Sequence, residues 1–522
     1  MDFGNIPMLK ELLGKISLDF KKDDMISENA GNVYVDAYSQ EYWSTSLPKL
    51  LFANGLVDKG NADNIFVLSP NLDENFSDIC KAFGANVISI KNRGVLLKTL
   101  FMAVELFVFH NTESKLYEFT INGIKMGKYL ADFIIRTQGE VYTINKIRSS
   151  DMKKVIAFLW AYNSIAIQFK RNKPKYFIVH ETGYWYGPVI IMAEKYGAEL
   201  IQCTNGNRII EFGDKVGLGI TPCELWNYEL RNAMATIDHD NIDYKKWAAS
   251  YYDHRLKGLT DVDAEDAYAN KRVITKEEWV RESGADINKK NVVVMAHCFS
   301  DDANTTTNKS LYRDYYMWLV ETLKIISKIE TVNWLLKAHP GRKVYNEGDG
   351  VYDIFERYSN KKCMYILNDN VSTESLYDIA DGVITVTGTC GLEFPSHGIP
   401  AVCAGFSAYG ELGVCIEPKT IDEYVDVLNK MKSLEKLDEE QVDLAHKVSC
   451  AYFSLRNPGD ESDSLMRKAY DYPKFSDGND DTVSGLLKYY AENKTLKKSI
   501  FYKIGKEYKG GRKQCLTTSR FL

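Results

Sequence analysis

Short, almost wholly apolar segments alternate with helix-patterned stretches along most of the chain, and this alternation limits the possible folds more than any other feature. The apolar segments form two series, residues 64–68, 86–90, 176–180 and 200–203, and then residues 291–296, 334–337, 364–367, 382–386 and 400–404. Strands that are apolar on both faces are typical of parallel sheets covered by helices on each side. The pattern predicts an α/β protein with two Rossmann-like, doubly wound domains facing a cleft. Ligands in such sheets bind beyond the carboxyl ends of the strands.

A polar and charged stretch, residues 261–290, separates the two series. We therefore expect an amino-terminal domain over residues 1–285, a carboxyl-terminal α/β domain over residues 286–450, and a helical extension with a basic tail over residues 451–522. Helices are expected at residues 126–136, 188–196, 311–328, 375–380, 391–397 and 421–432.

The charge balance and the cysteine pattern exclude several classes of protein. With 65 Lys and Arg against 71 Asp and Glu, the net charge of −6 argues against a nucleic-acid binder that neutralises phosphates broadly. The ten cysteines include no CxxC pair, so neither a zinc site nor a disulfide framework is indicated, and reduced thiols fit a cytoplasmic protein. The two most apolar runs, Leu100–Phe109 and Val155–Phe169, are shorter than the ~20 residues that cross a bilayer. We interpret both runs as buried core helices.

The strand at residues 334–337 ends in a motif suited to phosphate. Pro340 cannot continue a sheet ladder, so Lys337 and His339 lie at the carboxyl edge of the strand, where we expect both to contact a bound nucleotide. An imidazole there can donate to a phosphate or to a departing phosphate oxygen near neutral pH. A histidine whose bonds are satisfied in a strand-end turn is the alternative.

The next strand is followed by a predicted helix start. Ser372 or Thr373 is a good N-cap, and a helix that begins there would direct free N–H groups toward an anion. Ordinary capping without a ligand explains Ser372 equally well.

The third element is the tight turn after residues 382–386. Thr387, Gly388 and Thr389 could cradle phosphate with their amides and hydroxyls. Glu393 lies one helical turn beyond Thr389, where its carboxylate could accept hydrogen bonds from ribose hydroxyls. A purely structural glycine turn is the alternative. Together the three strand ends predict a site for a nucleotide mono- or diphosphate.

The motifs at residues 334–340, 372–381 and 387–402, with residues 297–302 and 315–319, resemble the carboxyl-terminal half of GT-B glycosyltransferases. More narrowly, residues 292–410 resemble the bacterial capsule-polysaccharide biosynthesis group that includes Kdo transferases. The resemblance implies a transferase that moves a sugar from a nucleotide-sugar donor to a surface polysaccharide or lipid-linked glycan. It implies donor contacts at the residues picked out above, His339, Ser372, Thr373, Thr387, Thr389 and Glu393. A similarity to bacterial sialyltransferases in the His-Pro and Ser-Thr pairs favours a CMP-linked acidic sugar.

The resemblance also implies that the amino-terminal domain binds the acceptor, so we look for the catalytic base there, at the end of residues 176–180. We expect Glu181 to deprotonate the acceptor hydroxyl, with His180 as the second choice. The aromatic residues Tyr184, Trp185 and Tyr186 could stack on a sugar. A turn with packed aromatic rings and an exposed Glu181 is nearly as good an interpretation. A later loop could bring Arg208 near an anion.

The remaining expectations concern cofactors, partners and other functions. No metal-binding motif stands out, metal dependence is left open, and no permanently bound cofactor is expected. The basic, aromatic-rich segment 488–513 could lie on the inner face of an anionic membrane or pack on the amino-terminal domain. The alternative functions are a glycerophosphate or polyol-phosphate transferase, a sugar-nucleotide epimerase, and a non-catalytic nucleotide-sugar-binding subunit of a capsule assembly complex.

Overall fold

The computed structural model describes residues 7–20, 31–37, 43–70, 74–203, 209–212, 221–260, 262–343, 345, 347–454 and 480–509. The chain divides into two compact units. Unit 1 comprises Met1–Gly127, Ile147–Gly219 and Leu455–Leu522, and unit 2 comprises Lys128–Lys146 and Ile220–Ser454.

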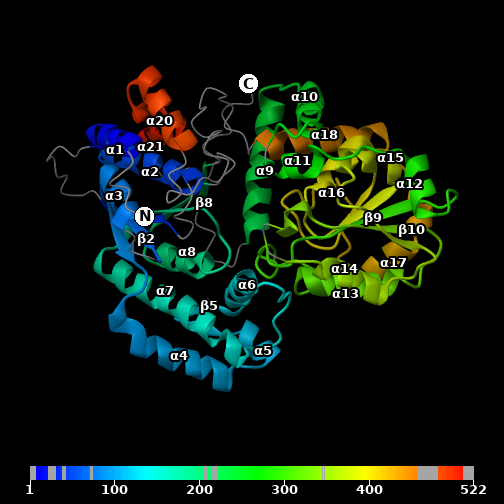
Figure 1. Ribbon diagram of the computed structural model, residues 1–522, viewed down its shortest axis with the longest axis horizontal. Coiled ribbons are helices and arrows are strands. Elements are labelled where there is room, and N and C mark those ends of the chain that lie inside the picture. The colour runs from blue at the N-terminus through cyan, green and yellow to red at the C-terminus, as the bar shows by residue number, and fades with distance from the viewer. Residues whose placement is uncertain are drawn as a thin grey trace. The chain divides into compact units, whose positions relative to one another are not determined.

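Unit 1 is built on a six-stranded sheet with the order β3-β2-β1-β6-β7-β8 (Figure 1). Its strands are β1 (Gly31–Asp36), β2 (Ala62–Ser69), β3 (Ala85–Ser89), β6 (Pro174–Val179), β7 (Glu199–Cys203) and β8 (Ile209–Phe212). All neighbours pair in parallel except β7 and β8, which are antiparallel. A small ribbon, β4 (Thr120–Ile121) with β5 (Ile124–Lys125), lies outside this sheet.

The helices of unit 1 are α1 (Pro7–Asp19), α2 (Trp43–Asp58), α3 (Glu74–Ala82), α4 (Leu96–Phe109), α5 (Glu113–Tyr117), α7 (Met152–Arg171), α8 (Tyr186–Lys195), α20 (Asp480–Asn493) and α21 (Ile500–Glu507). Short 3₁₀ turns are η2 (Arg93–Val95), η3 (Ser149–Asp151) and η10 (Leu496–Lys498). Helix α6 (Gly127–Gln138) begins where the chain passes into unit 2.

Unit 2 contains five parallel strands in the order β11-β10-β9-β12-β13. They are β9 (Asn291–Met295), β10 (Asn333–Lys337), β11 (Met364–Ile366), β12 (Gly382–Thr385) and β13 (Ala401–Cys403). The strand order reverses between β9 and β12, and the carboxyl edge at such a switch point is where doubly wound sheets bind ligands.

The helices of unit 2 besides α6 are α9 (Pro222–His239), α10 (Tyr244–Leu256), α11 (Val262–Tyr268), α12 (Lys276–Ser283), α13 (Tyr315–Ile326), α14 (Gly350–Tyr358), α15 (Leu376–Ile379), α16 (Cys390–Glu393), α17 (Ile421–Asn429) and α18 (Glu439–Ser454). Its 3₁₀ turns are η5 (Pro340–Lys343), η6 (Thr373–Ser375), η7 (Pro395–His397) and η8 (Met431–Ser433).

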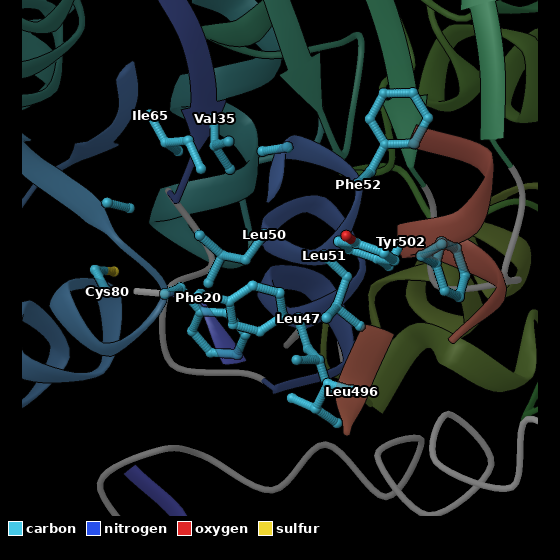
Figure 2. Packing of buried hydrophobic residues seen from close by; sticks show 14 of the residues in the cluster. Phe20, Val35, Leu47, Leu50, Leu51, Phe52, Ile65, Cys80, Leu496 and Tyr502 are labelled. Atoms are coloured by element: carbon cyan, nitrogen blue, oxygen red, sulfur yellow. The ribbon is translucent and has the colours of Figure 1, made fainter. Parts of the chain in front are cut away.

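The core of unit 1 joins segments from both ends of the chain. Figure 2 shows Leu47, Leu50 and Leu51 of α2 packed among buried side chains that include Phe20 and Tyr502. Helices α2 and α21 cross closely at two glycines. A Cβ added to Gly55 would lie 2.3 Å from the carbonyl oxygen of Tyr502, and one added to Gly505 would lie 2.2 Å from that of Phe52. Larger residues at either glycine would therefore force α21 away from the core.

The sheet of unit 2 is covered on both faces, as its sequence predicted. Alternate residues of β9 enter different hydrophobic clusters, since Val292 and Val294 belong to one and Val293 to the other. Side chains alternate across a strand, so a strand buried on both faces must be apolar at consecutive positions.

All nine predicted strands are confirmed, each with boundaries within two residues of the prediction. The prediction omitted β1, although β1 lies between β2 and β6 in the sheet. Its apolar run is only Val33-Tyr34-Val35, bounded by Asn32 and Asp36. A run this short is ambiguous from sequence, and its central place depends on pairing with strands far along the chain.

The two units are divided differently from the predicted boundaries of residues 1–285, 286–450 and 451–522. Residues 220–285 belong to unit 2 because polar contacts tie them there. Asn227 of α9 donates to the carbonyl oxygens of Ala408 (3.1 Å) and Gly410 (2.7 Å). The carboxyl-terminal helices α20 and α21 pack in unit 1 through the core described above.

The two most apolar runs of the sequence form helices α4 and α7, which differ in how far they are buried. Helix α7 is largely buried, as predicted. Helix α4 buries only Thr99, Ala103 and Leu106, so its prediction as a buried core helix is wrong: one face packs on α7 and the opposite face is exposed. Among the helices in the described ranges, none combines the length and the apolar character needed to span a bilayer.

Candidate active site

At the carboxyl edge of the unit 2 sheet, a histidine two residues beyond β9 contacts the end of β12. The Nε2 atom of His297 lies 2.9 Å from Oγ1 of Thr385, and the backbone N–H groups of Val386 (3.2 Å) and Thr387 (3.3 Å) donate to it. The imidazole thus bridges the two strands at the switch point. Sequence reasoning gave His297 no role, although its position immediately after an apolar strand was a usable signal.

Burial and the nearby His339 lower the pKa of His297 to about 3. The ring stacks on Tyr315, with 4.3 Å between the ring centroids. Because Nε2 accepts hydrogen bonds, the neutral ring carries its proton on Nδ1. His297 therefore offers a neutral N–H donor.

His339, the half-buried histidine after β10, belongs to the same edge. Its Nδ1 accepts from the N–H of Gly341 (3.1 Å) and lies 3.2 Å from Sγ of Cys298. With Nδ1 as the acceptor, a neutral ring carries its proton on Nε2. Because Cys298 directly follows His297 in the chain, this contact places His339 beside the loop that carries His297.

The turn after β12 is held in a fixed shape. The hydroxyl of Tyr409 donates to the carbonyl oxygen of Gly388, and that of Tyr315 lies 3.3 Å from Oγ1 of Thr387. A Cβ on Gly391 would lie 2.2 Å from the Tyr409 hydroxyl, so the turn requires glycine there. Thr387, Gly388 and Thr389 are half-buried. Of the predicted donor-binding residues, these three and His339 lie at accessible strand ends.

Lys337 has a different role from the predicted donor contact. Its side chain is buried, and Nζ donates to the carbonyl oxygen of Val371 at 2.8 Å. Burial and the charge of Lys271 lower the pKa of the Lys337 ammonium to about 8. The ammonium holds the loop after β11 instead of facing a ligand.

Ser372 and Thr373 are also buried. Oγ of Ser372 accepts from the N–H of Glu374 (3.2 Å), which is the ordinary capping bond, and its own N–H donates to the carbonyl oxygen of Arg272 (2.8 Å). The following η6 and α15 are too short for a strong helix dipole. The segment around Arg272 therefore covers the predicted anion site at this strand end.

The carboxylate of Glu393 is buried, and both of its oxygens accept hydrogen bonds from other side chains of unit 2. The carboxylate accepts from Nε (3.0 Å) and Nη2 (2.9 Å) of Arg255 and from the Tyr268 hydroxyl (2.9 Å). Burial raises the pKa of Glu393, but the charge and hydrogen bonds of Arg255, with hydrogen bonds from Thr389 and Tyr268, lower it to about 2 overall. The prediction of an open carboxylate for ribose is therefore corrected, because residues about 130 positions earlier occupy it.

The long loop after β9 is anchored by two buried carboxylates. Asp132 of α6 accepts from the N–H and Nδ2 of Asn304 (3.0 and 2.7 Å) and from Oγ1 of Thr305 (2.7 Å). Burial raises the pKa of Asp132 to about 6 although these bonds lower it. Glu347 accepts from both the N–H and the hydroxyl of Ser300 at 2.8 Å. These contacts fix the loop that begins at His297.

A second polar cluster lies at the carboxyl edge of the unit 1 sheet. Asp36, at the end of β1, pairs with the buried ammonium of Lys49 and accepts from the N–H of His180 at 2.6 Å. Nδ1 of His180 lies 3.3 Å from the carbonyl oxygen of Cys203, and its Nε2 lies 3.3 Å from Oε1 of Glu181. Sequence reasoning missed Asp36 and Lys49, although a lone lysine in the apolar run of α2 was a signal.

The side chains of the predicted acceptor loop divide into two groups. Glu181 is half-exposed next to His180, which fits both the predicted base and the alternative of an exposed Glu181 in a turn. Trp185 and Tyr186 are buried and contact each other, with ring centroids 4.5 Å apart, so the prediction that they stack on a sugar is corrected in favour of packing. Tyr184 is half-buried with a φ of 47°, a left-handed conformation that is uncommon for a residue other than glycine. Arg208 lies outside the described residues.

Two further predictions concern metals and the basic tail. Within the described ranges, no group of three or more His, Cys, Asp or Glu side chains is arranged to hold a metal ion. The aromatic residues of the tail, Tyr489, Tyr490, Phe501, Tyr502 and Tyr508, are buried in unit 1. In its described part, up to residue 509, the tail therefore packs on the amino-terminal sheet, which was the alternative to a membrane contact.

Comparisons with solved structures give low identities. The N-terminal domain of a Candida albicans trehalose-6-phosphate phosphatase is 12% identical, the match covers 87% of this chain and 99% of that chain, and the TM-score is 0.34. The beta Kdo 2,7 transferase KpsC of Thermosulfurimonas dismutans is 13% identical, covering 54% of this chain and 80% of that chain with a TM-score of 0.30. MurG of Acinetobacter baumannii is 10% identical. The match covers 85% of this chain and 99% of that chain, and the TM-score is 0.27.

A comparison with curated proteins found no match. The family described as "Capsule polysaccharide biosynthesis protein" matches residues 164–437, which is more than half of the 522-residue chain. The match contains every strand of the unit 2 sheet, and it also contains the end of β6 with His180 and Glu181. The chain therefore belongs to the capsule polysaccharide biosynthesis protein family.

Proposed function

We propose that the protein is a glycosyltransferase that moves a sugar from a nucleotide-activated donor to a surface polysaccharide or a lipid-linked glycan. The observation that carries the proposal is the cluster of His297, His339 and the turn at Thr387 at the switch point of the unit 2 sheet. Neutral N–H donors and backbone amides at this edge suit a nucleotide phosphate. The family match supports a role in making capsule polysaccharide.

The proposed chemistry is a substitution at the anomeric carbon of the donor sugar. The acceptor hydroxyl oxygen forms the new bond to that carbon while the bond to the phosphate oxygen breaks, and the nucleotide leaves with the electron pair. Glu181 takes the hydroxyl proton, with His180 beside it as the second choice. The N–H groups of His297 and His339 stabilise the charge that develops on the leaving phosphate.

The finer assignments belong to the same proposal. The donor is a CMP-linked acidic sugar in our first hypothesis, no resident cofactor is needed, and the protein works in the cytoplasm. Buried Lys337, Ser372 and Glu393 then act by positioning the strand ends and not by touching the donor.

The alternative functions differ in their products. A glycerophosphate or polyol-phosphate transferase would leave a phosphodiester in the acceptor. An epimerase would interconvert sugar nucleotides without an acceptor, and a non-catalytic subunit would bind a nucleotide sugar without turnover. No observation on the described residues favours one of these over sugar transfer.

The test is to incubate the full chain with CMP-, UDP-, GDP- and CDP-linked donors and capsule oligosaccharide acceptors, and to follow nucleotide release and the product mass. We expect nucleotide release with one donor class. His339→Ala should weaken donor affinity, whereas Glu181→Gln should lower turnover with donor affinity unchanged. Lys257→Met serves as the control, because the exposed ion pair of Lys257 with Asp253 contains none of the residues proposed to bind the donor or the acceptor. Donor binding without any turnover, or equal loss of donor affinity in the Glu181 variant, would contradict these roles.

A further inference from the structure

Helix α4 of unit 1 presents a broad apolar face to solvent. Six apolar side chains of this 14-residue helix are exposed: Leu97 (84%), Leu100 (38%), Phe101 (73%), Val104 (56%), Val108 (58%) and Phe109 (65%). Positions 97, 101, 104 and 108 recur at the spacing of one helix face. Single exposed apolar residues are ordinary, but a continuous stripe of this kind marks an interaction surface.

The orientation of α4 is fixed by its opposite face. Thr99, Ala103 and Leu106 are buried, and Nδ2 of Asn163 in α7 donates to Oγ1 of Thr99 at 3.1 Å. Figure 1 shows α4 running along α7. Rotating α4 to hide the apolar stripe would break this buried hydrogen bond. The packing of the opposite face of α4 therefore keeps the apolar stripe exposed in unit 1.

Basic residues flank both ends of the helix. Hydrogen bonds between Asn111 and the backbone of Ile147 (2.8 and 2.6 Å) bring the start of segment 146–154 to the carboxyl end of α4. Residues 91–118 and 146–154 together contain eight Lys and Arg against four Asp and Glu, a net charge of +4 in a chain whose net charge is −6. This local charge complements an anionic surface.

The size of the stripe decides between a lipid surface and a second copy of the chain. A helix of 14 residues is about 21 Å long and, at about 10 Å wide, offers roughly 200 Å². A stable dimer buries about 800 Å² on each partner, so this stripe alone is too small to hold one. A bilayer interface needs no complementary shape and accepts an amphipathic helix with a basic surround.

We propose that α4 docks unit 1 on an anionic lipid bilayer, with the apolar stripe inserted at the headgroup boundary. The basic residues at both ends of the helix contact the lipid phosphates. This surface differs from the basic tail, whose aromatic side chains are used inside the core of unit 1. The proposal depends on α4 and its neighbours alone and is independent of the proposed sugar transfer.

Co-sedimentation of the full chain with phosphatidylglycerol–phosphatidylethanolamine vesicles tests this surface. We expect binding that is absent with phosphatidylcholine vesicles and that weakens as NaCl rises. The double variant Phe101→Glu/Val108→Glu should bind about tenfold more weakly, since it removes apolar area and adds negative charge. Leu259→Glu, at an exposed leucine of similar accessibility (62%) in unit 2, should bind like the unchanged protein.

Three results would overturn the proposal. Binding that survives in the α4 double variant would place the contact elsewhere, and loss of binding in a Lys498→Glu/Lys503→Glu variant alone would place it on the tail. A change in sedimentation velocity mass between the protein and its α4 variant, without vesicles, would assign the stripe to self-association. Urea unfolding of the α4 variant, which changes only exposed side chains, checks that unit 1 remains folded.

Discussion

The buried pair of Arg255 and Glu393 leads to the sharpest prediction about stability. Both side chains are about 95% buried, with side-chain exposures of 4% and 5%, and they share two hydrogen bonds. Arg255→Met keeps most of the side-chain volume but leaves the carboxylate buried without its counter-charge. Breaking one partner of a buried pair costs about 3–5 kcal/mol, so we expect a loss of that size in the stability of unit 2 at pH 7.

The effect should depend on pH in a direction fixed by the pKa of Glu393. In the unchanged protein this pKa is lowered to about 2, so the pair stabilises the fold above pH 4.5, the ordinary value, and this stability is lost as the pH falls toward 2. In Arg255→Met, burial without the opposing charge raises the pKa instead. The folded variant then gains stability relative to its unfolded state as the pH falls. The difference between the two proteins should therefore shrink between pH 7 and pH 3.

Urea unfolding of the full chain at several pH values measures this difference. Because the pair lies within unit 2, the transition of that unit should move while that of unit 1 stays in place. Lys257→Met is the matched control, since both side chains of the Lys257–Asp253 pair are exposed and solvent screens their attraction, so the unfolding midpoint should stay unchanged. A loss below about 1 kcal/mol for Arg255→Met at pH 7, or a difference that grows on acidification, would refute the reasoning.

The same pair separates a positioning role for Glu393 from a contact with ribose. Arg255→Met/Glu393→Met replaces the pair by apolar side chains and should recover much of the lost stability. Nucleotide affinity should then be close to that of the unchanged protein if Glu393 only supports the turn at Thr389. A fall in affinity despite recovered stability would return Glu393 to the donor site.

Two further predictions concern the other polar clusters. Because burial and His339 lower the pKa of His297 to about 3, its ring resonances should not titrate between pH 8 and pH 5 by NMR. Its ordinary pKa is 6.5, so this group makes the fold less stable as the pH falls below 6.5, and a titration midpoint near 6.5 would contradict the described burial. In unit 1, Lys49→Met leaves Asp36 buried without its partner and should lower the stability of that unit by about 3–5 kcal/mol, measured as a lower urea midpoint. An unchanged midpoint would show that the pair contributes nothing.

The apolar pattern of the sequence was sufficient for the α/β architecture and for most strands. A strand covered on both faces must be apolar at consecutive positions, and this requirement is local, so β10 and β12 were predictable with their ends. Those ends also placed His339 and Thr387 at the carboxyl edge of a sheet. The same local reasoning missed β1, because its apolar run is short and its central position in the sheet depends on pairing with β2 and β6.

The sequence alone determined which residue types stand at the strand ends, whereas tertiary structure decided which of them are exposed. Glu393 was a plausible ribose acceptor until Arg255 and Tyr268 occupied its oxygens, and Ser372 was a plausible anion contact until the segment at Arg272 covered it. The apolar run of α4 was expected in a core, yet one of its faces found no partner within the described chain. The burial and the pairing of a side chain are set by segments that are distant in sequence. A local sequence pattern does not indicate which distant segment packs against it.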